Sequence, residues 1–155
     1  MQKFKNIYVG ATSQHVGKTT STLGLTSTFM ARGLKVGYSK PVGQNYLDIH
    51  NLKVDKDTVL FADLIDFEII PEIHSPIIFG PGATEAFLET PNTKELHQTL
   101  LNAEKYLAHK NEIVIYEGTG HPGVGSVGGV SNAKVAKILD AGVIMVVEGG
   151  IGSTI

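Results

Sequence analysis

The amino-acid sequence predicts an α/β fold in which a mostly parallel sheet carries helices on both faces. Four short apolar strands alternate with helical segments along the 155 residues, and this alternation is typical of a parallel sheet buried between helical layers. Unusual loops follow three of the strands, after Val9, Lys40 and Tyr116. Because ligands bind beyond the carboxyl ends of parallel strands, we expect these loops to meet at one site.

The N-terminal residues form a unit of the size expected for a parallel βαβ motif. A short apolar strand at residues 7–9 precedes a polar loop at residues 10–17. The segment from Lys18 to Arg32 reads as a helix, and Gly33 suits the left-handed conformation that ends a helix. A second strand, "KVGYSK", ends near Lys40 because Pro41 forbids its continuation.

The middle of the chain predicts two further helices. The stretch "VDKDTVLFADLID" is expected to be helical after Asp57, with its apolar side formed by Val59, Leu60, Leu64 and Ile65. Residues 67–92 mix proline, glycine and apolar residues, and their pattern assigns no element to this stretch. The segment from Thr93 to Lys110 predicts an amphipathic helix whose inward side chains are Leu96, Leu100, Leu101 and Ala103.

The last part of the chain predicts strand, loop, helix and strand. A buried strand in "EIVIYEG" ends at Glu117, and a glycine-rich loop follows up to Asn132. The helix in "NAKVAKILDAG" is expected to stop at Gly142, before a final strand in "VIMVVEGG". Only four strands are clear and the chain ends in a loop, so we expect residues 1–155 to be a single nucleotide-binding domain that is truncated at its C-terminus.

Composition excludes several classes of function. A formal net charge of −2 gives no electrostatic reason to expect a nucleic-acid partner. The chain has no cysteine, which excludes disulfides, zinc–thiolate sites and thiol catalysis. No signal peptide is recognisable, and no segment approaches the roughly 20 apolar residues that a membrane span needs. We therefore expect a cytoplasmic protein without a membrane partner.

The loop after the first strand resembles a phosphate-binding loop. Gly17, Lys18 and Thr19 open the first helix, where backbone N–H groups, a lysine and a hydroxyl would meet phosphates and Mg²⁺. The usual spacing G-x-x-x-x-G-K-[ST] would put a glycine at position 12, where Thr12 stands, and the nearest glycine is Gly10. The alternative interpretation is a glycine–lysine turn that caps an ordinary helix.

The chain resembles the dethiobiotin synthetase-like family of P-loop NTPases along nearly its whole length. The shared features are a stretched loop ending in "VGKT", the turn "KPV" after the second strand, and a strand ending in "EG". The segments "YVGATSQHVGKTT", "GYSKPVGQ" and "EGTGHPGVGSV" are closer still to the dethiobiotin synthetase-like N-terminal domain of some phosphate acetyltransferases and to its stand-alone relatives.

This resemblance implies a P-loop NTPase that binds ATP and Mg²⁺. It places Lys18 at the β- and γ-phosphates and Lys40 opposite, at the transferred phosphate or the substrate carboxylate. It assigns Thr19, Glu117 and Asp57 to the metal, with Asp55 as the alternative to Asp57. The nucleotide-binding residues are then Gln14, His15, Val16, Gly17, Lys18, Thr19 and Thr20.

Three of these assignments have plainer alternatives or independent support. Asp57 before Thr58 is also suited to a helix N-cap. Lys40 could be a solvated residue at the end of a strand. Glu117 ends a buried strand, where a carboxylate is costly unless it is paired or bound to a metal, and this favours a functional role.

One substitution bears on the reaction. Dethiobiotin synthetases have Thr-Glu before Val-Gly-Lys, whereas this chain has Gln14-His15, so carboxylation of a diamine is not expected. Two hypotheses remain: ATP-dependent activation of a carboxylate or carbamate by phosphoryl transfer, and a non-catalytic nucleotide-sensing module. A degenerate domain is a third, although it would not need to keep Lys18, Thr19, Lys40 and Glu117.

Partners and the glycine-rich loop are the remaining expectations. The partners are a nucleotide and an unidentified small molecule, and the resemblance keeps a homodimer open. The loop from Glu117 to Asn132 is interpreted as a lid, a substrate platform or a subunit contact. His121 within it is more simply an exposed residue than an acid–base group.

Overall fold

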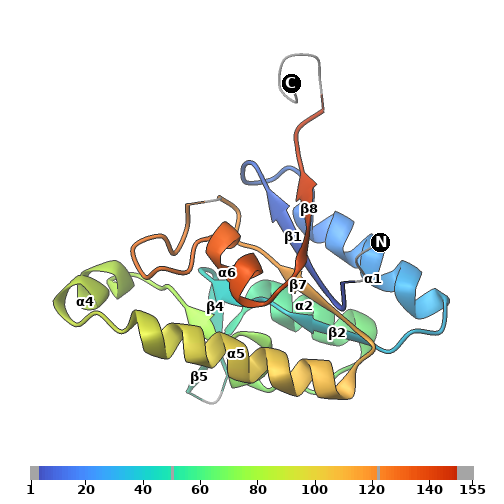
Figure 1. The fold of residues 1–155 in the computed structure, drawn as a ribbon, viewed down its shortest axis with the longest axis horizontal. Coiled ribbons are helices and arrows are strands. Elements are labelled where there is room, and N and C mark those ends of the chain that lie inside the picture. Colours follow the sequence, from blue (N-terminus) through green and yellow to red (C-terminus); the bar gives the residue numbers. More distant parts are fainter. Residues whose placement is uncertain (1–3, 50, 122, 150–155) are drawn as a thin grey trace.

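The computed structural model describes residues 4–49, 51–121 and 123–149. Its centre is a parallel sheet with the strand order β2-β7-β1-β8 (Figure 1). The four strands are β1 (Asn6–Ala11), β2 (Val36–Ser39), β7 (Ile113–Glu117) and β8 (Gly142–Val146). These are the four strands that the sequence predicts, and the predicted parallel α/β architecture is confirmed.

The strand β7 lies between β1 and β2. Its register places Tyr116 beside Tyr8 and Glu117 beside Val9, while Ser39 at the end of β2 pairs with Tyr116. The carboxyl ends of β1, β2 and β7 therefore lie next to one another. All five residues of β7 are buried, which explains why this strand is apolar up to its last residue.

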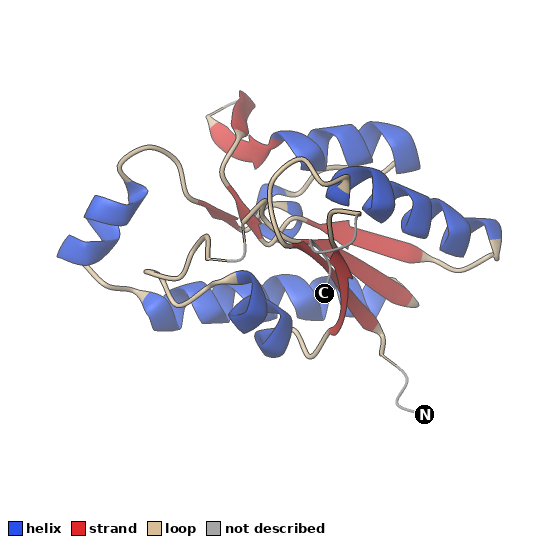
Figure 2. Cartoon of the chain, turned by 90° about the horizontal axis from the view of Figure 1, so that it is seen from above, coloured by secondary structure: helices blue, strands red, loops and turns tan. Residues whose placement is uncertain are grey.

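Helices cover both faces of this sheet, as Figure 2 shows. One face packs against α5 (Thr93–Lys110) and α6 (Asn132–Ile138) through a buried cluster that includes Tyr8, Tyr116 and Leu100. The other face is covered by α1 (Lys18–Ala31) and α2 (Lys56–Ile65), where the rings of Tyr38 and Phe61 stack with centroids 3.9 Å apart. The sequence-predicted bounds of α5 are confirmed.

Several short elements join these layers. The hairpin of β4 (Tyr46–Ile49) and β5 (Leu52–Asp55) is antiparallel, and β3 (Val42–Gly43) pairs in parallel with β6 (Ile77–Ile78). The helical turns α3 (Pro71–His74) and α4 (Ala83–Glu89) complete the fold. The stretch at residues 67–92, which the sequence pattern left unassigned, thus contains α3, β6 and α4, which are too short to show a clear period.

Three other local predictions are wrong. The second helix begins at Lys56 and not after Asp57. Its inward residues are Thr58, Phe61 and Ala62, while Leu60 and Leu64 are 44% and 52% exposed; on α5, Leu101 is likewise 42% exposed. The helix α6 ends at Ile138, and Gly142 is the first residue of β8 and not a helix stop. By contrast, Gly33 does follow α1 with a left-handed φ of 82°.

The strand β8 forms one edge of the sheet and carries exposed apolar side chains. Val143, Ile144 and Met145 are 56%, 42% and 51% exposed. Within the described residues, β8 pairs only with β1. The helices of the described part include none that is long and apolar enough to cross a membrane.

Candidate functional site

The phosphate-loop candidate joins β1 to α1. The amide of Thr12 donates to Val146 O at 3.2 Å, so position 12 still belongs to the strand pairing and needs no glycine. Gly17 is the N-cap of α1 with a left-handed φ of 89°, and no side chain caps the helix. The first N–H groups of α1 are therefore available to an anion, which is the property that a phosphate loop requires.

Two lysines and three carboxylates gather beside this helix start. Lys18 Nζ forms an ion pair with Glu117 Oε1, and Thr19 Oγ1 donates to the same oxygen at 2.9 Å. Lys40 Nζ forms an ion pair with Asp57 and lies 3.4 Å from Glu117 Oε1. The three strand ends thus bring together the residues that the sequence predicts for one site.

The group is almost entirely shielded from solvent. Glu117 is 0% exposed, Lys40 5% and Lys18 8%. The hydroxyl of Tyr38 donates to Glu117 Oε2 at 3.3 Å. Buried charges persist only when they are paired, and Glu117 satisfies this through both lysines. Lys40 is accordingly not a solvated residue at the end of a strand.

The mutual charges shift several pKa values. Burial and the neighbouring Lys40 lower the pKa of Lys18, despite the opposing effect of Glu117. Burial would also lower the pKa of Lys40, but Glu117, Asp55 and Asp57 outweigh it and raise the pKa. Lys40 therefore stays protonated at neutral pH, as a group that neutralises a phosphate must.

Asp55 and Asp57 have different positions. Asp55 is the N-cap of α2, and its side chain accepts from the amide of Asp57 at 3.0 Å and from that of Gln44 at 3.2 Å. Burial raises the pKa of Asp55. The alternative of Asp57 as the N-cap is therefore wrong. Asp57 has a side chain 31% exposed that reaches Lys40, and this attraction overcomes burial and lowers its pKa.

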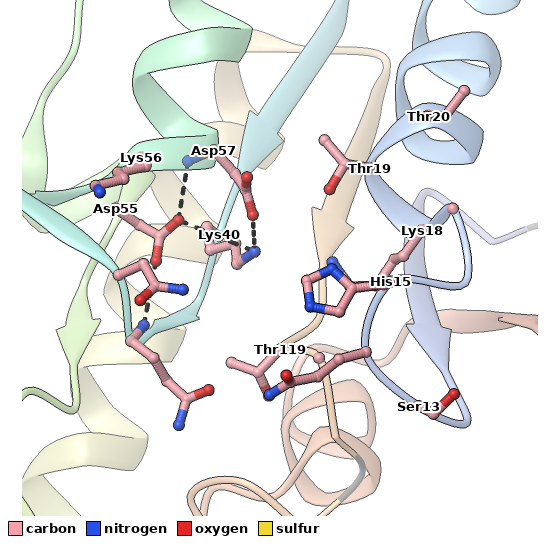
Figure 3. Close-up of a pocket in the computed structure, with 15 residues that line it drawn as sticks. Ser13, His15, Lys18, Thr19, Thr20, Lys40, Asp55, Lys56, Asp57 and Thr119 are labelled. Atoms are coloured by element: carbon pink, nitrogen blue, oxygen red, sulfur yellow. Dashed lines mark hydrogen bonds and ion pairs between the residues drawn. The ribbon is translucent and has the colours of Figure 1, made fainter.

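Lys18, Lys40 and the two aspartates line a cavity of about 680 Å³, shown in Figure 3, whereas Glu117 lies behind them and is not part of its lining. Lys40, Asp55 and Asp57 lie on one side of it, and His15, Lys18 and Thr19 from the phosphate loop lie on the other. Of the predicted loop residues, Val16 alone does not line the cavity. Its lining also contains residues that the sequence did not single out: Ser13, Gln44, Asn45, Lys56, Thr119 and Gly120. Gln44 and Asn45 directly follow "KPVG", and this position is the feature of the sequence that could have identified them as lining residues.

The glycine-rich loop reaches this cavity only at its start. Thr119 and Gly120 line it, and Asn132 fixes Thr119 by accepting from its amide and its hydroxyl, both at 3.1 Å. Farther along, Gly129 O lies 2.9 Å from His97 Nε2 on α5. His121 accepts from the amide of Gly123 and does not line the cavity.

The donor set suits a hard cation that also binds phosphate. Among residues 4–49, 51–121 and 123–149, no three His, Cys, Asp or Glu side chains form a cage for a metal. A hydroxyl and one or two carboxylates are nevertheless close together in Thr19, Glu117 and Asp57. Mg²⁺ is commonly bound in this way, with phosphate oxygens and water as the other ligands.

Comparisons with known proteins agree with this geometry. A family described as an AAA domain matches residues 5–155. The chain is 27% identical over 154 residues to the ATP-dependent dethiobiotin synthetase BioD of Clostridium kluyveri, covering 96% of this chain and 64% of that protein. It is 29% identical over 146 residues to a phosphate acetyltransferase of Pseudomonas putida, covering 94% of this chain and 19% of that protein.

A solved structure has the same fold. The chimerical protein CapA2B2 is 12% identical and has a TM-score of 0.55, with 93% of this chain and 62% of that chain covered. The chain thus spans less than two thirds of the length of each of these proteins.

Proposed function

The chain belongs to the AAA domain family of dethiobiotin synthetase-like P-loop NTPases, and from this premise we propose that it binds Mg·ATP and activates a carboxylate or carbamate by phosphoryl transfer. The observation that carries the proposal is the meeting of Lys18, Lys40 and Glu117 from three separate strand ends. Phosphoryl transfer depends on positioning and charge neutralisation, and this group supplies both.

Each residue has a separate task in this proposal. The free N–H groups at the start of α1 hold the phosphates, and Lys18 moves from Glu117 to the β- and γ-phosphates. Thr19, Glu117 and Asp57 would hold Mg²⁺, which supplies charge neutralisation between the phosphates. Lys40 faces the γ-phosphate from the opposite wall of the cavity.

This phosphoryl transfer needs no cofactor other than ATP and Mg²⁺. An oxygen of the substrate carboxylate or carbamate attacks the γ-phosphorus, while the bond to the β,γ-bridging oxygen breaks. ADP leaves, and an acyl or carbamoyl phosphate forms. Gln44, Asn45 and Lys56, which line the cavity beyond Lys40, are the candidates for binding the substrate.

The first test is calorimetric titration of Mg·ATP into the protein and into Lys18→Ala. We expect the variant to lose at least about a hundredfold in affinity, because a charge-assisted contact to the phosphates is removed inside a buried site. The matched control is Lys105→Ala, an exposed lysine on α5, which should bind as the wild type does. Equal binding by Lys18→Ala and the wild type would contradict the proposal.

A second candidate is a nucleotide-sensing module. It is favoured by the similarity to a phosphate acetyltransferase, of which this chain matches only 19%, and by Gln14-His15 in place of the Thr-Glu of dethiobiotin synthetases. A phosphate-release assay on the calorimetric samples separates the two functions. Turnover stimulated by a carboxylate substrate supports the enzyme, whereas tight binding without turnover supports the sensor.

A further inference from the structure

A second cavity of about 600 Å³ lies at the start of β2, beside the ends of α1, α2 and α5, and is open on one side. Met30, Ile65, Tyr106, Lys110 and His74 are among the residues that line it. None of its lining residues belongs to the cavity at the phosphate loop. The two cavities are therefore separate sites.

His74 provides a buried hydrogen-bond donor to this second cavity. The residue is 6% exposed, and its Nδ1 accepts from the amide of Ile70 at 2.9 Å. Burial, reinforced by the positive charge of Lys110, lowers the pKa of His74 to about 4. The ring is thus neutral at pH 7 and carries its proton on Nε2.

That Nε2–H group has no hydrogen-bond partner within the described part of the chain. Nε2 is not among the fully enclosed polar atoms of the described residues that lack a partner, so it is open to the cavity, where an acceptor of a ligand can replace water. The cavity beside it is large enough for a small molecule.

The surroundings of the donor define the chemistry of that molecule. The ring of Phe67 packs on that of His74 with centroids 4.5 Å apart. Lys110 Nζ lies 4.3 Å from the centre of the Tyr106 ring and donates to its hydroxyl at 2.6 Å. Aromatic walls, an ammonium and an unpaired N–H together fit a flat ring that bears an anionic oxygen. The carboxylates of Asp66 and Glu68 belong to exposed residues of the lining.

We propose that this cavity binds a small aromatic carboxylate. The carboxylate accepts from His74 Nε2–H and pairs with Lys110, and its ring packs against Phe67 and Tyr106. The site is distinct from the phosphate loop, and its binding step does not depend on the function proposed above.

The backbone of His74 connects the two cavities. Its carbonyl oxygen accepts from the amide of Lys40 at 2.9 Å and from the hydroxyl of Thr58 at 3.1 Å. A ligand that fixes the His74 side chain therefore also restrains the backbone that positions Lys40. Resting on the proposed function, occupation of this cavity changes the affinity for Mg·ATP, and Mg·ATP changes the affinity for the ligand by the same factor.

Benzoate is the probe for the binding step. It is titrated into the full ¹⁵N-labelled chain without nucleotide, and the His74 Nε2–H signal and the amides of α3 are followed by NMR. We expect saturable binding with a Kd below about 1 mM, and about tenfold weaker binding of benzyl alcohol, which lacks the charge. Absence of a saturable shift at His74 overturns the proposal.

Two variants separate a ligand-binding histidine from a structural one. His74→Asn keeps an acceptor for Ile70 N–H but removes the donor, whereas His74→Gln carries an amide nitrogen near the position of Nε2. We expect His74→Asn to weaken benzoate binding about tenfold and His74→Gln to retain it within about threefold. Equal losses in both variants overturn the proposal.

Lys110→Gln keeps the test decisive if a histidine variant does not fold, since Lys110 is exposed near the end of α5. The Lys110→Gln substitution should weaken benzoate binding about tenfold, and unchanged binding overturns the proposal.

Lys18→Ala distinguishes failure of this site from failure of the proposed function. It should lose Mg·ATP binding and keep the wild-type affinity for benzoate. In the wild type, saturating benzoate should change the Kd of Mg·ATP at least about fivefold. If benzoate binds but Mg·ATP does not, the proposed function fails and the second site stands.

Discussion

At the scale of single residues, Glu117 controls the state of both lysines in the cavity. Its Oε1 receives Lys18 and Thr19 and lies 3.4 Å from Lys40. Lys18 cannot bind a phosphate and remain on this carboxylate in the same geometry. In the proposed function, the exchange of Lys18 from carboxylate to phosphate is therefore part of nucleotide binding, and it can be measured.

We predict that Glu117→Gln binds ATP more tightly than the wild type when no metal is present. The substitution frees Lys18 from its ion pair, and a tenfold gain is expected from one charge-assisted contact. Calorimetry in EDTA measures it, with Glu95→Gln, an exposed carboxylate of α5, as the control. Adding Mg²⁺ should raise the ATP affinity of the wild type more than that of Glu117→Gln. A weaker affinity of Glu117→Gln for ATP in EDTA would contradict this role.

A second residue-scale prediction concerns the pH dependence of folding. The pKa of His74 is about 4 in the folded chain, against 6.5 for an ordinary histidine. Between these values the unfolded chain binds the proton more readily, so stability falls as the pH falls from 6.5 towards 4. Urea unfolding across this range should show a steeper loss for the wild type than for His74→Asn. Parallel curves would mean that His74 is not buried in its neutral form.

At the scale of elements, the central strands carry two tyrosines with contrasting surroundings. Tyr8 on β1 and Tyr116 on β7 are paired in register, and both are 1% exposed. Tyr8 donates to Asn132 Oδ1 at 2.7 Å, whereas the Tyr116 hydroxyl has no partner in the described part of the chain. Only the first of these hydroxyls stabilises the packing of α6 on the sheet.

This contrast predicts opposite effects of one chemical change. Tyr8→Phe should lower the free energy of unfolding by about 1–2 kcal/mol, because it leaves a buried amide oxygen with fewer donors. Tyr116→Phe should leave the free energy of unfolding unchanged or raise it by up to about 1 kcal/mol, since it removes an unsatisfied buried hydroxyl. Chemical denaturation of the two variants beside the wild type gives the comparison. A larger loss in Tyr116→Phe would show that its hydroxyl is hydrogen-bonded, for example to buried water.

The sequence predicted those elements whose apolar pattern is long or complete. The four strands of the sheet and the bounds of α5 follow from such patterns. The hairpin β4–β5 and the turn α3 were missed, because two to four residues are too few for a period to be visible. On α2, burial does not follow apolar character alone: Leu60 is exposed, while Thr58 is buried at the contact with α3.

The candidate site was predictable in its members and less so in its contacts. Parallel strands with adjacent carboxyl ends require Lys18, Lys40 and Glu117 to lie close together. The division of roles between Asp55 and Asp57 depends on where α2 begins. A difference of two residues in that start exchanged the helix cap for the group that reaches Lys40. Gln44 and Asn45 were missed because their only signal was their position directly after "KPVG".

At the scale of the whole molecule, α3 and β2 both connect the cavity at the phosphate loop with the second cavity. The segment of Ile73, His74 and Ser75 contacts the end of β2 through Ser39 and Lys40 and the start of α2 through Thr58. The side chain of His74 faces one cavity, and its carbonyl supports the other. Effects of the second cavity on the phosphate loop can therefore pass through α3 and through Tyr38 of β2, which lines the second cavity and donates to Glu117.

The strand order has a consequence for how the protein is made on the ribosome. β1 and β2 do not pair with each other, because β7, residues 113–117, separates them. A nascent chain that ends before Ile113 thus carries the complete phosphate loop together with β1 and β2. It lacks β7, the strand that pairs with both of them. Arrested chains ending at Glu112 should be rapidly digested by protease, whereas the full chain should resist. Resistance of the shorter chain would mean that local contacts suffice. We therefore expect the phosphate loop to be translated early and to acquire its shape only after β7 has left the exit tunnel.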